Sequence, residues 1–183
     1  LDPVSGKFYL VDWYDDFLVE IAADASAVLR DQDVGTSLWQ LVVAPDGQHV
    51  YVTDRGNDLV REMSTATLLE TRSFPVGDDP WGLDITADGA ALVCTCEDSH
   101  NAFIIDVGTG GGTPVTLDAS ADPRDVDILD AQGLAFVTGG QLANGTSPVF
   151  VVSLGQQAVI DSFDGPGSNT NVTPLSLLTN RSL

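Results

Sequence analysis

The chain repeats itself every 42 residues, and this period constrains its fold more than any other feature. The stretch Phe-Tyr-Leu-Val-Asp at residues 8–12 aligns with residues 50–54, and again with residues 92–96. A fourth copy begins near Phe136, displaced by one further residue. Self-similarity at a fixed period of this size indicates a repeat architecture, in which each unit is one supersecondary element.

Each unit contains four short segments with strand character. In the second unit these are residues 39–44, 50–53, 59–63 and 68–75. The turn Pro45-Asp46-Gly47 predicts a hairpin between the first two, because proline fixes φ and glycine accepts positive φ. Four antiparallel strands in about 42 residues is typical of a propeller blade. We therefore predict an all-β propeller of four-stranded antiparallel blades.

The whole chain, residues 1–183, is expected to form a single propeller domain or a propeller fragment with about four blades. The expected blades are residues 36–77, 78–120 and 121–167, with a fourth assembled from residues 1–35 and 168–183. In that fourth blade, residues 173–178 would supply the first strand. A closed four-blade ring, a part of a larger ring and a pair of chains that completes one ring all remain open.

The residues around the hairpin resemble a known family. Tyr51-Val52-Thr53-Asp54, with Pro45-Asp46-Gly47 before it and residues 76–80 after it, resembles the YVTN-type β-propeller repeat of surface-layer and lactonase-like propellers. Residues 96–106 resemble that family's strand-loop-strand segment. The resemblance covers nearly the whole chain and implies a larger ring, often with seven blades. It implies little about function, because the family's motif residues are structural.

In propellers, the loops between blades and the loops between second and third strands share one face, which is the usual binding face. Here that face concentrates acidic and aromatic side chains, and aromatic and arginine side chains are common anchors of interfaces. Trp39, Trp81 and Arg124 begin equivalent innermost strands, so we expect them to surround the mouth of the central channel or to pack between blades. The binding-face candidates are Trp13, Trp39, Trp81, Arg124, Asp54, Asp58 and Asp79.

Two sets of residues are candidate metal ligands. Asp84 and Asp127 occupy matching positions on inner strands, where a divalent cation such as calcium would offset their repulsion. Cys94 and Cys96 lie on one face of a strand, with His100 nearby, which suggests a soft-metal site. The competing interpretation is a pair of packed free thiols. No cofactor is predicted beyond this possible cation.

Charge narrows the classes of partner. The chain has 7 Lys and Arg against 27 Asp and Glu, a formal net charge of −20. Such a surface disfavours nucleic acid and anionic lipid, and favours cations, basic partners or simple solubility in a secreted protein. No apolar run approaches the ~18 residues that span a bilayer, so membrane insertion is not expected.

No catalytic residues are predicted, since no complete catalytic signature is present. The leading hypothesis is a non-enzymatic binding scaffold in an extracellular, periplasmic or cell-surface location, with a protein or glycan ligand. The alternative is a metal-dependent lactonase-like hydrolase or a periplasmic dehydrogenase-type subunit, with Asp84, Asp127, Asp54 and His100 at the channel mouth. A purely architectural spacer is the third hypothesis.

Overall fold

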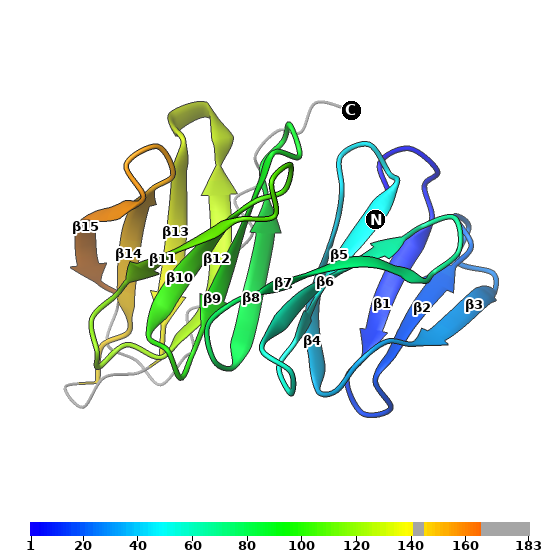
Figure 1. The fold of residues 1–183 in the computed structure, drawn as a ribbon, viewed down its shortest axis with the longest axis horizontal. Helices are drawn as coiled ribbons and strands as arrows, with labels where there is room; N and C mark the ends of the chain where they lie inside the picture. The colour runs from blue at the N-terminus through cyan, green and yellow to red at the C-terminus, as the bar shows by residue number, and fades with distance from the viewer. Residues whose placement is uncertain (141–144, 166–183) are drawn as a thin grey trace.

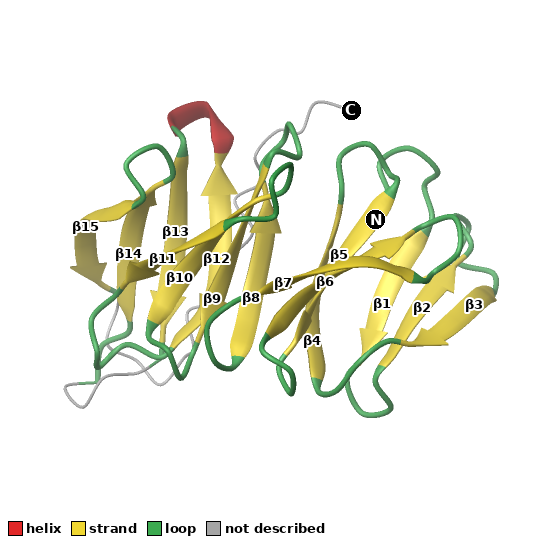
Figure 2. Cartoon of the chain, in the orientation of Figure 1, coloured by secondary structure: helices red, strands yellow, loops and turns green. Residues whose placement is uncertain are grey.

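A computed structural model describes residues 1–140 and 145–165, and nearly all of its regular structure is β-strand (Figures 1 and 2). The strands are β1 (Phe8–Asp12), β2 (Phe17–Ile21), β3 (Val28–Asp33), β4 (Leu38–Val43), β5 (His49–Asp54), β6 (Leu59–Ser64), β7 (Glu70–Pro75), β8 (Pro80–Ile85), β9 (Ala91–Cys96), β10 (Asn101–Asp106), β11 (Gly112–Thr116), β12 (Pro123–Leu129), β13 (Leu134–Gly139), β14 (Pro148–Ser153) and β15 (Ala158–Asp164). One 3-10 turn, η1 (Asp130–Gln132), joins β12 to β13. No helix among these residues is long and apolar enough to cross a bilayer.

The strands form four antiparallel sheets in sequence order. β1–β3 make a three-stranded sheet, and β4–β7, β8–β11 and β12–β15 make four-stranded sheets in which each strand pairs with its neighbours along the chain. The predicted all-β propeller architecture is confirmed. The strand predicted at residues 173–178 lies outside the described residues.

Turn chemistry and a repeated threonine shape the inner hairpins. Gly47 and Gly89 occupy equivalent turns with φ of +69° and +73°, a region that glycine enters without steric cost. The first strand of each four-stranded sheet has an irregular register near its start. In two sheets a threonine hydroxyl accepts the amide N–H there, from Gln40 to Thr53 at 2.9 Å and from Gly82 to Thr95 at 2.7 Å.

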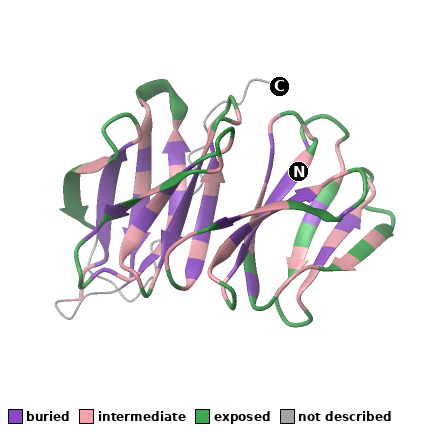
Figure 3. Ribbon diagram, viewed as in Figure 1, coloured by how far each residue is buried: buried purple, intermediate pink, exposed green. Residues whose placement is uncertain are grey.

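The core lies between neighbouring sheets, in three apolar clusters. The first joins β1–β3 to β4–β7 through residues such as Tyr9, Leu18 and Val52. The second and third repeat this arrangement at the next two sheet interfaces. In Figure 3 the buried segments accordingly face neighbouring sheets, whereas loops and outer strands are exposed. Stacked sheets, each too thin to bury its own faces, are therefore the basis of the fold.

A buried charged group repeats in the first two sheets. The Tyr9 hydroxyl donates to Glu20 at 3.1 Å, and Lys7 and Arg30 pair with the same carboxylate at 2.9 and 2.6 Å. Forty-two residues later, Tyr51 donates to Glu62 at 3.2 Å and Arg72 pairs with it at 2.6 Å. The third sheet has Val93 and Ile104 at the same positions, both buried in the apolar cluster.

The four sheets stand in a row along the longest axis, with β1–β3 at one end and β12–β15 at the other (Figure 1). Contacts run from β1 to β4, from β4 to β8 and from β8 to β12. The described residues thus form an open arc of a larger ring, and the closed four-blade alternative is wrong. The reason is geometric: the rotation between successive sheets does not bring the first and last sheets together.

Candidate functional site

Loops from three sheets lie together on one face of the arc, at the bottom of Figure 1, which we call the loop face. They comprise the connections that lead into β4, β8 and β12 and the hairpin loops β5–β6 and β9–β10. Backbone hydrogen bonds tie these two kinds of loop together, with the Gly56 N–H donating to Thr36 O at 2.9 Å and Glu97 N–H to Asp79 O at 2.9 Å. The loops are therefore held by the sheets that they connect, and their side chains are placed with little freedom.

Trp39 and Trp81 lie at the centre of the loop face. Their ring centroids are 4.4 Å apart at an interplanar angle of 63°, an edge-to-face contact. Trp39 is 41% exposed, so part of its indole faces solvent. Their equivalent positions at the starts of β4 and β8 explain the contact, because these strands lie side by side. The two tryptophans therefore pack against each other between neighbouring sheets.

Two arginines stack on Trp81. The Arg55 guanidinium lies 3.9 Å from the Trp81 ring centroid and 5.6 Å from that of Trp39, and the Arg124 guanidinium lies 4.6 Å from Trp81. Asp79 holds Arg55 in a bidentate pair at 2.7 and 2.9 Å, while Glu97 pairs with Arg124. Guanidinium groups over aromatic faces add cation–π attraction to the packing.

Trp39, Trp81, Arg55, Arg124, Asp79 and Glu97 form what we call the Trp81 cluster. Within it, the pKa values of the two carboxyl groups, Asp79 and Glu97, shift in opposite directions. Burial alone would raise the pKa of Asp79, but hydrogen bonds from Arg55 and from the Trp81 indole N–H, at 2.9 Å to Asp79 Oδ2, hold it below its ordinary value. Burial raises the pKa of Glu97, although Arg124 opposes the shift. Glu97 Oε2 is buried and makes no hydrogen bond within the described residues. Asp79 is therefore the firm anchor of the cluster and Glu97 the weaker one.

Arg55 and Glu97 are the two residues around Trp81 that were not among the binding-face candidates from the sequence. Both belong to the polar hairpin loops that the repeat identifies as part of the binding face. The 42-residue period aligns Arg55 with Glu97 and with Trp13, three unlike side chains, so a linear comparison assigns this position no common role. Their role follows from reaching across to the next sheet.

Asp54 and Asp58 were predicted on the binding face, and the structure uses both within the fold. Asp54 is fully buried, accepting hydrogen bonds from Asn57 Nδ2 and, at 2.6 Å, from Arg61 Nε. Asp58 Oδ1 accepts the Asp79 amide N–H at 3.0 Å. Asp54 is accordingly corrected from a surface contact to a buried anchor, since its carboxylate points under the loop.

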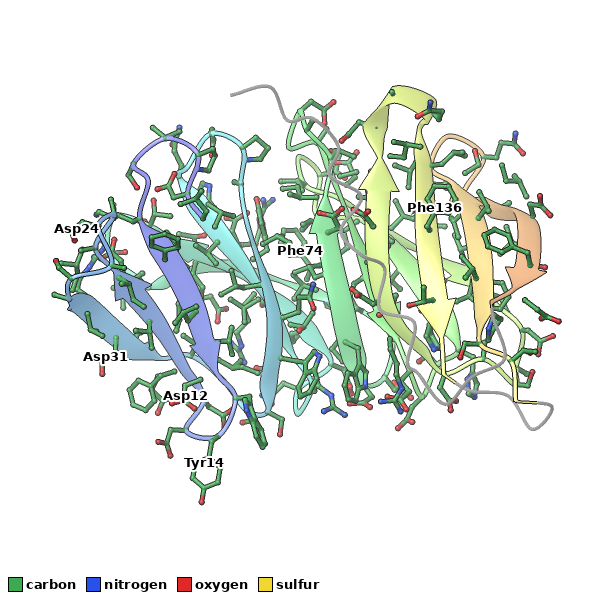
Figure 4. All side chains as sticks on the ribbon, turned by 180° about the vertical axis from the view of Figure 1, so that it is seen from behind. Asp12, Tyr14, Asp24, Asp31, Phe74 and Phe136 are labelled. Atoms are coloured by element: carbon green, nitrogen blue, oxygen red, sulfur yellow. The ribbon has the colours of Figure 1, made fainter. Side chains whose placement is uncertain are left out.

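Trp13 lies on the β1–β2 loop, on the same loop face but outside the Trp39–Trp81 pair. It is 65% exposed and contacts Tyr14 edge-to-face, with centroids 6.2 Å apart. Figure 4 shows Tyr14 projecting from this loop away from the sheets. The two rings form a separate exposed aromatic pair.

Asp84 and Asp127, the proposed cation ligands, lie on the adjacent strands β8 and β12. Asp84 Oδ2 accepts the Ile128 N–H at 2.8 Å, and Oδ1 accepts the Ile85 N–H. Burial raises the pKa of nearby Asp125, and the charges of Asp127 and Asp84 raise it further. Asp84 Oδ2 thus joins β8 to β12, whereas Oδ1 accepts from the next residue of its own strand, so both oxygens already accept backbone N–H groups.

The cysteines and His100 do not form a soft-metal site. Cys94 and Cys96 are free thiols, both fully buried, and burial raises the pKa of Cys94. His100 Nδ1 instead lies 2.8 Å from Ala121 O. Across residues 1–140 and 145–165, no three His, Cys, Asp or Glu side chains are grouped to hold a metal. Because the described residues bring no such group of three side chains together, no metal-dependent step is derived.

A model of the family described as "Lactonase, 7-bladed beta-propeller" matches residues 21–126, more than half of the sequence. The chain belongs to this lactonase family. Membership agrees with the propeller resemblance seen in the sequence, but it does not confirm the YVTN-type repeat family specifically. No curated protein matches this lactonase-family chain significantly.

Solved structures share the fold at low sequence identity. The lactonase-family chain is similar to a Kuenenia stuttgartiensis hydrazine synthase structure, with a TM-score of 0.83 and 18% identity, over 90% of this chain and 47% of that one. It is also similar to U3-55K, with a TM-score of 0.73 and 14% identity, over 90% and 49% of the two chains. A catalytically inactive virginiamycin B lyase from Staphylococcus aureus with quinupristin gives 0.74 and 13%, over 92% and 55%. The chain therefore spans about half the length of each.

Proposed function

We propose that this chain is part of a non-enzymatic binding propeller whose ligand contacts the Trp39–Trp81 pair. The observation that carries the proposal is the arrangement of Trp81 against two guanidiniums beside a Trp39 that is 41% exposed. Rigid aromatic side chains with a solvent-facing surface supply contact area at low conformational cost. An extracellular, periplasmic or cell-surface location suits the acidic composition.

The ligand class that we favour is a glycan or a protein segment with an apolar face and hydrogen-bond acceptors. Trp39 offers ring surface, while Arg55 and Arg124 offer N–H groups beyond those used by Asp79 and Glu97. The rest of the chain is strongly acidic. Arg55 and Arg124 therefore make the loop face around Trp81 less repulsive to anionic groups than its surroundings.

The test is binding of the fluorescently labelled chain to arrays of immobilised oligosaccharides and synthetic peptides. Trp39→Ala should weaken the strongest interactions at least tenfold, and Arg55→Ala should weaken them to a lesser extent. Trp13→Ala removes an exposed tryptophan outside the pair and is the matched control. If every ligand bound Trp39→Ala as tightly as the unmodified chain, the Trp39–Trp81 pair would be excluded as the binding surface.

A second candidate, lactonase-like hydrolysis, is favoured by the family match alone. Its residues would be Asp84 and Asp127 on the inner strands, with His100 at the nearby loop. The measurement is lactone ring opening over a panel of sugar and aliphatic lactones, with and without calcium. Activity that disappears in both Asp84→Asn and Asp127→Asn would favour this candidate over the binding scaffold.

A further inference from the structure

A pocket of about 270 Å³ opens between the second and third sheets. Its rim includes the β4–β5 and β8–β9 turns, which lie at the top of Figure 1, on the side of the arc opposite the loop face. The polar side chains that line it are Asp46, His49, Tyr51, Glu62, Arg72 and Asp88. The pocket therefore brings turns from two sheets together with the buried carboxylate of Glu62.

The first sheet shows what the carboxylate equivalent to Glu62 binds. Forty-two residues earlier, Glu20 pairs with the Lys7 ammonium group, with 2.9 Å between Nζ and Oε1. Lys7 aligns with His49, which is a shorter side chain. The His49 Nε2 atom lies 3.8 Å from Glu62 Oε1, which is beyond hydrogen-bond distance. In the second unit, no side chain thus supplies the ammonium group that Lys7 supplies in the first.

Glu62 has fewer cationic partners than Glu20. Glu20 pairs with the ammonium of Lys7 and with the guanidinium of Arg30. Glu62 pairs with one guanidinium, at 2.6 Å, and accepts hydrogen bonds from two neutral hydroxyl groups. An ionised carboxylate has about four lone-pair sites. Glu62 can therefore accept one more donor than these three.

The lining of the pocket favours a cation with a short apolar chain. One guanidinium stands against three carboxylates, a net charge of −2 with histidine neutral. Negative potential in a partly enclosed site raises the local concentration of cations. Among the described residues, no three His, Cys, Asp or Glu side chains are grouped to hold a metal, which favours an organic cation. Ala44, Pro45 and Val107 contribute apolar surface that methylene groups can cover.

We propose that this pocket binds the ammonium group of a primary alkylamine, in the position that Lys7 holds in the first unit. An ammonium group has three N–H donors and no acceptor, so it matches the Glu62 carboxylate and the carboxylates of Asp46 and Asp88 at the rim. A free small amine and the side chain of a lysine in a peptide offer the same group. The site is separate from the loop face and does not depend on the function proposed for that face.

The test is an NMR titration of the ¹⁵N-labelled chain at about pH 8, where alkylammonium ions stay protonated. The probes are n-butylammonium for a free amine and Nα-acetyl-lysine methylamide for a peptide lysine. We expect saturable shifts of the amide signals around His49 and Asp88 with both, at a dissociation constant on the order of 1 mM for such small ligands. The tighter of the two probes identifies the source of the amine. The uncharged control n-butanol should bind at least about tenfold more weakly, because it lacks the charge-assisted hydrogen bond.

His49→Lys gives the second unit the residue of the first, so that its own ammonium group should fill the pocket, as Lys7 does beside Glu20. Amine binding should then weaken several-fold in a chain that stays folded, as the dispersion of its amide signals shows. Gln48→Lys adds the same charge at the exposed neighbouring residue, and this matched control should keep the affinity of the unmodified chain. Asp88→Asn removes one carboxylate from the rim and should weaken binding by a smaller factor than His49→Lys.

The proposal is overturned if neither amine produces saturable shifts at these signals, or if n-butanol binds as tightly as n-butylammonium. Amine binding to His49→Lys that is as tight as binding to the unmodified chain also overturns it. An equal loss of affinity in Gln48→Lys and His49→Lys would reveal a general effect of charge and would rule out the pocket as the site.

Discussion

Glu20 is a carboxylate at 1% exposure that is ionised because three donors surround it. The pKa of Glu20 is lowered from 4.5 to about 2. The hydrogen bond from Arg30 is the largest cause, hydrogen bonds from Lys7 and Tyr9 lower the pKa further, and burial opposes them. A lowered pKa in the folded state means that the ionised form stabilises the fold. This stabilisation is complete above about pH 4.5 and is lost as the pH falls toward 2.

We therefore expect acid to destabilise the chain through Glu20 by ~2–3 kcal/mol across this window, at about 1.4 kcal/mol per pKa unit. Glu20→Gln should be less stable at neutral pH and should show a flatter pH dependence of the free energy of unfolding below pH 4.5. Asp31→Asn, which removes an exposed carboxylate from β3, is the charge control. Parallel pH profiles for Glu20→Gln and the unmodified chain would contradict the assignment.

The buried position of Glu20 is occupied by a charged group in the second sheet and by apolar residues in the third. Glu62 is held by Tyr51, Arg72 and the Thr71 hydroxyl, whereas the third sheet has Val93 and Ile104 at the Tyr51 and Glu62 positions. Removing one partner of a buried ion pair leaves the other uncompensated, but replacing the group by packed apolar residues is often neutral.

Glu62→Ala should thus cost about 3 kcal/mol of unfolding free energy, because Arg72 and the Tyr51 hydroxyl lose their acceptor. The combined variant Tyr51→Val, Glu62→Ile and Arg72→Leu, which imitates the third sheet at its first two positions, should lose less than Glu62→Ala alone. Chemical denaturation measures both. A combined variant that is the less stable of the two would show that the charged group does more than fill space.

At the scale of elements, the inner strands β8 and β12 approach each other closely at Gly82. A Cβ atom on Gly82 would lie 2.6 Å from the Asp125 Cα and 2.9 Å from the Arg124 carbonyl oxygen, both backbone atoms. Backbone on both sides cannot move without shifting a whole strand. The absence of a side chain therefore sets the distance between these two blades, next to the Trp81 cluster.

Gly82→Ala should destabilise the chain by about 2–3 kcal/mol, as overpacking of a rigid contact does. Gly155→Ala is the matched control, because a Cβ there meets nothing within 4 Å. Thermal and urea unfolding compare the two. Equal stability of Gly82→Ala and Gly155→Ala would mean that the inner strands can separate at little cost.

For the molecule as a whole, the net charge of −20 opposes compaction. The six basic residues among the described residues are all engaged in ion pairs, so they neutralise particular carboxylates and leave the general surface acidic. Long-range repulsion among exposed charges is screened once the Debye length falls, from roughly 30 Å at 0.01 M to 8 Å at 0.15 M salt.

Raising NaCl from 10 to 150 mM (roughly these two Debye lengths) should therefore raise the thermal unfolding midpoint by several degrees, since exposed carboxylates repel less. A variant in which the exposed residues Asp12, Asp15 and Asp31 become Asn should respond less to salt. A midpoint that falls with added salt would mean that the ion pairs outweigh the general repulsion. Differential scanning calorimetry at constant pH provides the measurement.

The sequence alone determined the blade unit, its turns and the equivalence of Trp39, Trp81 and Arg124, because those features follow from local propensity and a 42-residue period. Only the tertiary structure decided that the arc is open, that Asp54 is buried, and that Arg55 and Glu97 join the tryptophans. The physical reason is that these properties depend on the rotation between neighbouring sheets. Residues far apart in the chain meet across that interface, and no pattern within one blade encodes which of them touch.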